Sequence, residues 1–100
     1  MTQTEDRLRV VAAVPLDEEL CRLIERIEPR VEMSSDPSLV PPMRWPADWE
    51  GDPSFSRTPQ QQADFEAMVD SAAALFGIPD VSPAQLARTV AANPRLRWVM

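Results

Sequence analysis

The chain has 100 residues, 44% of them hydrophobic, which is enough for one globular domain with a modest core. Its formal net charge at pH 7 is -6. This excess of negative charge argues against nucleic acid or an anionic membrane as the main partner, because both need clustered positive charge.

The cysteine content and the lack of long apolar runs indicate where the protein works. One Cys cannot form an internal disulfide, so nothing calls for an oxidising compartment. We interpret Cys21, beside the apolar positions of a helix, as a packing residue. No run approaches the roughly 18 apolar residues of a membrane span. The sequence therefore predicts a cytoplasmic protein with no membrane partner.

The first third of the chain predicts a strand, a helix and a second strand. Residues 1–7 are polar and are expected to fray. Residues 8–14 form a nearly continuous apolar run, typical of a buried parallel strand. Asp17 can cap an amphipathic helix, whose apolar stripe holds Leu20, Leu23, Ile24 and Ile27. This helix closes before Pro29, and residues 30–33 can form a short strand.

Residues 34–57 predict a long loop, because five Pro interrupt them and no period is sustained. Its aromatic residues favour a packed loop over a disordered one. Two interpretations of the stretch from Arg44 to Trp49 remain open. It can be a lid whose Arg44 reaches an anionic group, or the Trp can pack under the loop while Arg44 is solvated; the second is favoured. The carboxylates of residues 48–52 predict a solvated acidic turn and no calcium site.

The last part of the chain predicts a helix followed by a strand, a crossover helix and a strand. Thr58 starts the first helix, with its apolar stripe at Phe65, Met68, Val69 and Ala72. An apolar run over residues 72–76 stops at residues 77–80. A second helix begins at Ser82 and ends at Asn93, and the apolar residues 96–100 form the last strand.

This alternation predicts an α/β protein with a parallel sheet of about four strands flanked by helices. We expect a flavodoxin-like arrangement with the first strand central, left incomplete at residue 100. In open sheets of this kind ligands bind beyond the carboxyl ends of the strands, which makes residues 77–80 the first candidate site.

Two stretches of the sequence also resemble a known family. The run VPPMRWPADWEGDPSFSRTPQQQADFEAMVDSAAALFGIP, followed by SPAQLARTVAANPRLRWV, is similar to the N-terminal part of D-isomer-specific 2-hydroxyacid dehydrogenases, in the branch related to phosphoglycerate dehydrogenase. The resemblance implies that residues 8–100 are a truncated flavodoxin-like substrate-binding domain. It also implies hydride transfer between NAD(P) and a small 2-hydroxy or 2-keto acid, with the catalytic Arg, Glu and His in a separate Rossmann domain.

The same resemblance implies a substrate site in this chain. The backbone N–H groups of Gly77 and Ile78, with the side chains of Phe76 and Ile78, would line the substrate cleft next to Pro79, and Arg44 is the candidate for an anionic group. The alternative is that residues 77–80 form only a tight turn that needs glycine.

The residues themselves argue against catalysis by this chain alone. It has no His to act as a base near neutral pH, and its two Gly form no dinucleotide-binding fingerprint. We therefore expect no catalytic residue, bound cofactor or metal here. The competing hypothesis is a non-enzymatic α/β interaction module that dimerises through its exposed last strand, and in either case we expect self-association.

Overall fold

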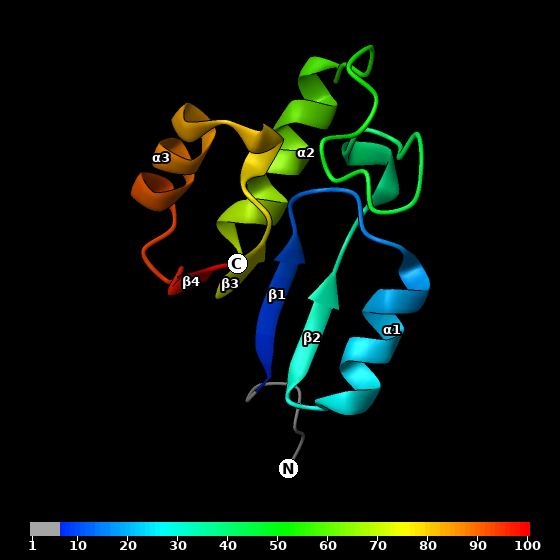
Figure 1. Ribbon diagram of the computed structural model, residues 1–100. Coiled ribbons are helices and arrows are strands. Elements are labelled where there is room, and N and C mark those ends of the chain that lie inside the picture. The colour runs from blue at the N-terminus through cyan, green and yellow to red at the C-terminus, as the bar shows by residue number, and fades with distance from the viewer. Residues whose placement is uncertain (1–6) are drawn as a thin grey trace.

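The computed structural model describes residues 7–100, which form one parallel sheet and its flanking helices (Figure 1). In chain order the elements are β1 (Leu8–Ala12), α1 (Glu18–Ile27), β2 (Val31–Ser34), η2 (Pro37–Leu39), α2 (Pro59–Asp70), β3 (Ala74–Phe76), η3 (Pro79–Val81), α3 (Pro83–Ala92) and β4 (Trp98–Val99).

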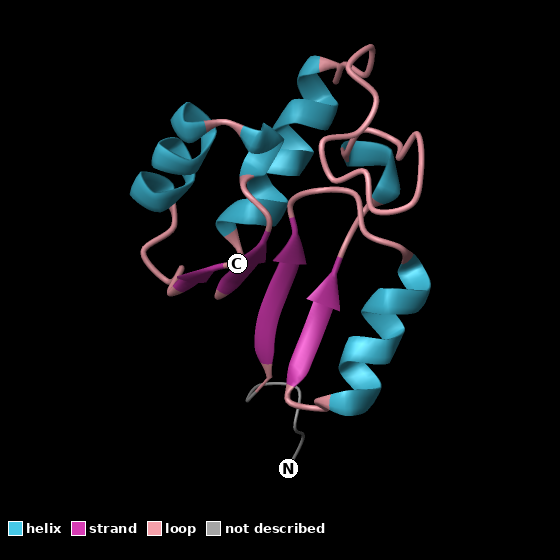
Figure 2. Ribbon diagram, viewed as in Figure 1, coloured by secondary structure: helices cyan, strands magenta, loops and turns pink. Residues whose placement is uncertain are grey.

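The four strands run in the same direction, in the order β2-β1-β3-β4. The predicted α/β class is thus confirmed, and the order is the flavodoxin-like one with β1 inside the sheet. The register places Val10 opposite both Met33 and Ala74. Figure 2 shows the carboxyl ends of the strands pointing toward the long loop, so the loops that follow β1, β2 and β3 gather at one end of the molecule.

The two faces of the sheet bury different clusters. On one face, Val11 and Leu75 pack with Phe65 and Val69 of α2, and all four side chains are buried. On the other face α1 supplies Cys21, which is fully buried and packs with Val10, Met33 and Ala74. The packing role predicted for Cys21 is confirmed, and burial raises the pKa of its thiol.

The first helix covers its face of the sheet only in part. Three members of its predicted apolar stripe, Leu20, Leu23 and Ile27, are exposed, because the helix turns Cys21 toward the sheet instead. Further along the same face, Trp98 and Met100 are 67% and 59% exposed. The parallel sheet is therefore covered by helices on one face and left partly open on the other.

At two of the predicted helix starts the N-cap side chain accepts a backbone hydrogen bond from the first turn. Thr58 Oγ1 accepts from Gln61 N at 3.1 Å and Thr58 N donates to Gln61 Oε1 at 2.9 Å, so α2 begins with a full capping box. Ser82 Oγ accepts from Gln85 N at the start of α3. Asp17 stands at the N-cap of α1, but its side chain makes no capping hydrogen bond.

Several predicted boundaries differ from the structure. Regular pairing in the last strand covers only two residues, although Arg97 N donates to Ala73 O and Met100 N to Leu75 O on either side of it. The long loop contains one short 3-10 turn, η2. The predicted frayed residues 1–7 lie outside the described part of the chain except for Arg7, which is exposed. No helix within residues 7–100 is long and apolar enough to cross a membrane.

Candidate functional site

A large hollow lies at the carboxyl end of the sheet and is here called the aromatic cleft. Its volume is about 690 Å³. Its walls come from the ends of β1 and β3, the long loop, η3 and the last residue, namely Val14, Trp45, Ala47, Asp48, Trp49, Glu50, Phe76, Gly77, Ile78, Val81 and Met100. The position and the volume are those of ligand sites in open α/β proteins.

Gly77 lets the end of β3 approach the end of β1. Its φ is +90°, and a Cβ built on it would lie 2.6 Å from both methyl carbons of Val14. No other residue type fits there without movement. The preceding residue, Phe76, meets Trp49 of the long loop edge to face, with ring centroids 6.0 Å apart. Two segments far apart in sequence thereby form one wall.

The structure brings together three of the five residues predicted for the site. Phe76, Gly77 and Ile78 line the aromatic cleft. The N–H of Gly77 is not free for a ligand, however, because it donates to Met100 O at 3.0 Å. Pro79 is fully buried and is not one of the residues that line the aromatic cleft. Of the two predicted backbone donors, only that of Ile78 makes no hydrogen bond to another described residue.

Arg44, the remaining candidate, is not one of the residues that line the aromatic cleft, but it is held against two that are, Trp45 and Asp48. Its Nε donates to Asp48 Oδ2 at 2.7 Å and its Nη2 to Oδ1 at 3.2 Å. This pair lowers the pKa of the Asp48 carboxyl to about 2 and raises that of Arg44. The guanidinium also stacks over Trp45 at 4.3 Å from the ring centroid. Among the described residues, Nη1 is the side-chain nitrogen of Arg44 that donates no hydrogen bond, so it could donate to a ligand.

Two predictions about the long loop are wrong. The indoles of Trp45 and Trp49 do not pack beneath it but are 56% and 52% exposed and face the aromatic cleft. Asp48 is not part of a solvated acidic turn but is buried, since it accepts hydrogen bonds from Arg44 and from Gly51 N. The buried carboxylate therefore organises the loop.

Backbone strain is concentrated around the aromatic cleft. Within residues 7–100, the non-glycine residues with positive φ are Ala47, Asp80 and Val81, at 64°, 56° and 49°. Ala47 and Val81 line the cleft and Asp80 lies between two lining segments. For the β-branched Val81 this conformation is a genuine outlier. Such residues persist only where the surroundings hold them, and they gather at functional sites.

The side chain that holds this strained turn is Arg57, which sequence reasoning missed. Its side chain is 7% exposed, and its Nη2 lies 2.9 Å from Asp80 Oδ1. It also donates from Nε to Leu39 O at 2.6 Å and stacks on Phe65 at 3.7 Å. Its partners in the loop and the turn, Leu39 and Asp80, lie 18 and 23 residues away, so no local sequence pattern marks this role.

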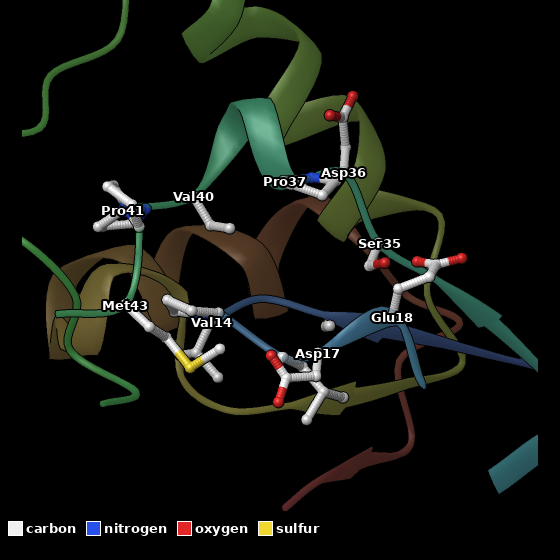
Figure 3. Close-up of a pocket in the computed structure, with 13 residues that line it drawn as sticks. Val14, Asp17, Glu18, Ser35, Asp36, Pro37, Val40, Pro41 and Met43 are labelled. Carbon is white, nitrogen blue, oxygen red and sulfur yellow. The ribbon is translucent and has the colours of Figure 1, made fainter. Parts of the chain in front are cut away.

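A second, smaller hollow of about 240 Å³ lies between the loops that follow β1 and β2. Its lining is mostly aliphatic and proline-rich, and includes Val14, Val40, Pro41 and Met43 (Figure 3). The acidic side chains at its edge, Asp17, Glu18 and Asp36, point in different directions in Figure 3. It offers no cation to an acid and no convergent ligands to a metal, so the larger cleft is the better candidate.

The walls of the aromatic cleft offer aromatic faces, the backbone N–H of Ile78 and two carboxylates, those of Asp48 and Glu50. Arg44 is not one of the lining residues, but it is paired with Asp48, which is. In the part of the chain described by the structure, no group of three or more His, Cys, Asp or Glu could hold a metal ion. No family model, no curated protein and no solved structure matches the chain.

Proposed function

We propose that this chain is the substrate-binding part of an NAD(P)-dependent D-2-hydroxyacid dehydrogenase. In this proposal the aromatic cleft holds a small 2-hydroxy or 2-keto acid, and a separate dinucleotide-binding unit supplies the cofactor, the base and the hydride transfer. The proposal includes a cytoplasmic location, which agrees with a sequence whose one Cys cannot form an internal disulfide.

One observation carries the proposal: of the five residues with positive φ in the described part of the chain, three line the aromatic cleft. Gly77, Ala47 and Val81 line the cleft with positive φ values. A fold holds strain where a precise surface is needed, and here that surface lies at the carboxyl ends of parallel strands. The resemblance of the sequence to the dehydrogenases then suggests which ligand the surface takes.

The ligand chemistry follows from the rim and the walls. The acid carboxylate would meet Nη1 of Arg44 and the N–H of Ile78, and its carbon chain would lie against Trp45 and Trp49. Because Asp48 already neutralises Arg44, and Glu50 is nearby, we expect weak binding by the chain alone, with a Kd near the millimolar range, about -4 kcal/mol.

Tryptophan fluorescence tests the proposal directly. The probes are D-lactate and pyruvate, with L-lactate and acetate as controls for chirality and for carboxylate alone. We expect saturable quenching by D-lactate and pyruvate, weaker quenching by L-lactate, and none by acetate. Arg44→Met should abolish the response. Arg30→Met is the matched control, because Arg30 forms an exposed pair with Glu28 and lies outside the cleft.

Two outcomes would overturn the proposal. The first is an identical, non-saturable response to all four acids in the wild-type chain. The second is oxidation of D-lactate by the isolated chain with NAD or NADP, because the sequence has no His to accept the proton.

A second function is favoured by the open face of the sheet. We infer that the chain can act instead as a non-enzymatic interaction module that dimerises through β4. Trp98, Val99 and Met100 are all exposed, and β4 is the edge strand next to β3. Antiparallel pairing of two β4 strands about a two-fold axis would place Trp98 and Met100 of both copies on the same face of one continuous sheet.

Sedimentation velocity discriminates the two functions when combined with the binding experiment. A stable dimer that binds none of the acids supports the interaction module, and Val99→Pro should then return it to a monomer by removing an edge donor. A monomer at high micromolar concentration rejects this second function. Acid binding by a dimer would leave the dehydrogenase proposal in place.

A further inference from the structure

The turn after β3 is held in an unfavourable conformation by contacts from outside it. Asp80 and Val81 are consecutive left-handed residues, and neither is glycine. Inside the turn, Val81 N donates to Ile78 O at 2.9 Å and Ser82 N to Pro79 O at 3.0 Å. Turns of this size form with ordinary φ values as well, so these two bonds alone do not select the left-handed form.

The contact from outside the turn is made by Arg57, whose two terminal nitrogens both lie against the Asp80 carboxylate. Nη1 donates to Oδ2 at 3.0 Å. Nη2 lies 2.9 Å from Oδ1, close enough for an ion pair although its geometry is not that of a hydrogen bond. A planar fork that meets both carboxylate oxygens fixes the direction of Asp80 as well as its distance, which an ammonium group cannot do.

The same guanidinium is anchored on its other sides. Its Nε donates to Leu39 O at 2.6 Å, and its plane lies over the buried ring of Phe65 at 3.7 Å and near Phe55 at 5.6 Å. Arg57 therefore links η3 both to the start of the long loop and to α2. The Arg57 side chain is 7% exposed and that of Asp80 is 30% exposed, so solvent screens this ion pair less than a pair in which both partners lie on the surface.

We propose that Arg57 is a positioning residue that sets one wall of the aromatic cleft by holding Asp80 and Val81 in the left-handed turn. Val81 follows Asp80 directly and lines the cleft together with Ile78. When the Arg57–Asp80 ion pair is lost, Val81 relaxes to a negative φ, and the part of the cleft wall formed by Ile78 and Val81 moves. The inference depends on the proposed function only in treating the cleft as a binding site.

Amide hydrogen exchange measured by NMR tests the role without any ligand, so a failure of acid binding leaves this test unaffected. In Arg57→Met we expect the amides of residues 81 and 82 to exchange at least about ten-fold faster, while the amide of Val11 in β1 is unchanged, because a hydrogen bond to a charged group is lost locally. The matched control is Arg88→Met. Arg88 also links two elements through an Asp, with Nη2 to Asp70 Oδ1 at 2.8 Å, but it lies outside the cleft.

A rescue separates positioning from general stability. Val81→Gly removes the penalty for positive φ, so adding it to Arg57→Met should return the exchange at positions 81 and 82 to within about three-fold of the wild type. A side chain needed only for packing would not be rescued in this way.

Equal exchange in the Arg57 and Arg88 variants, or no rescue by Val81→Gly, would overturn the proposal. If Arg57→Met does not fold, Asp80→Asn replaces it, because this change weakens the pair at the turn and leaves the stacked guanidinium in the core. Faster exchange confined to residues 81 and 82 supports the role, and unchanged exchange in that variant rejects it.

Discussion

The contact between Gly77 and Val14 determines how closely two strand ends meet beneath the aromatic cleft. Gly77→Ala would place a methyl group 2.6 Å from two carbons of Val14, in a backbone conformation unfavourable for alanine. We expect the free energy of unfolding to fall by about 2–4 kcal/mol, the sum of the left-handed penalty and overpacking. Urea unfolding followed by circular dichroism measures it.

A double-mutant cycle separates the two causes. Val14→Ala removes both of the carbons that clash, so Gly77→Ala should be less destabilising in that background by about 1 kcal/mol or more. If the two substitutions are additive, the clash is not the cause, and the backbone penalty alone explains the loss.

The Arg44–Asp48 pair predicts an acid-sensitive loop. The pKa of Asp48 falls from an ordinary value of 3.8 to about 2 in the folded chain. A depressed carboxyl pKa contributes stability that is present above the unfolded pKa, so this contribution should be complete above about pH 4 and be lost as pH falls toward 2. The difference in urea midpoint between wild type and Asp48→Asn should shrink over that window. A constant difference from pH 5 to 2 would contradict the assignment.

Individual side chains show where sequence reasoning succeeded. Cys21 could be predicted as buried because free Cys behaves as a small hydrophobe. The strand-end rule for open sheets pointed to residues 77–80 and the family resemblance to Phe76; Phe76, Gly77 and Ile78 do line the cleft, and their role in binding stays a prediction. Arg57 and the buried state of Asp48 could not be predicted, because both depend on partners that only the folded loop supplies.

Among the elements, the helix starts differ in how well their backbone donors are satisfied. Thr58→Ala removes a side-chain acceptor from α2 and should lower the free energy of unfolding by about 1 kcal/mol. Ser82→Ala should have a similar effect on α3. Asp17→Ala should cost only a few tenths of a kcal/mol, since Asp17 makes no capping bond and retains only its interaction with the helix dipole. Thermal or urea unfolding of the three variants gives the ranking.

This ranking would be contradicted if Asp17→Ala lowered the free energy of unfolding as much as Thr58→Ala does. All three residues are good N-caps by type, so sequence alone gave them the same role. The difference arises in the folded chain, where the Asp17 backbone has φ -59° and ψ 138° and its side chain does not reach back to the helix.

The first helix shows how periodicity identifies an element but not its orientation. Four apolar residues at helical spacing predicted α1. The face that packs on the sheet is nevertheless centred on Cys21, and Leu23 and Ile27 remain exposed. The position of α1 is set by Val10 and Met33 beneath it, together with the hydrogen bond from Met33 N to Glu25 at 2.8 Å.

At the scale of the whole molecule, the sheet is unevenly covered, and this asymmetry explains what the sequence could and could not predict. The alternation of apolar runs predicted the parallel sheet and its order, because crossover connections leave few alternatives. Of the residues predicted for the site, those that line the cleft all come from the end of β3, whereas Arg44 of the long loop does not line it. Most of the other lining residues come from the long loop, whose prolines exclude regular structure, so no periodicity could show that its indoles face the cleft.

The open face should make the stability of the chain depend on its concentration. Leu8, Trp98 and Met100 are 44%, 67% and 59% exposed on a parallel sheet, a type of sheet that is normally buried on both faces. If a second copy covers them, mass action stabilises the folded state, and the thermal midpoint should rise by several degrees between low and high micromolar protein.

Trp98→Ser should remove this dependence and lower the midpoint measured at high concentration. Trp45→Ser is the control, because Trp45 is similarly exposed, at 56%, but lies at the cleft and not on the open face. A midpoint independent of concentration in the wild type would show that the open face is not covered by a second copy. Equal loss of the dependence in both variants would show that the contact between copies is not confined to the open face, because Met100 lines both that face and the aromatic cleft.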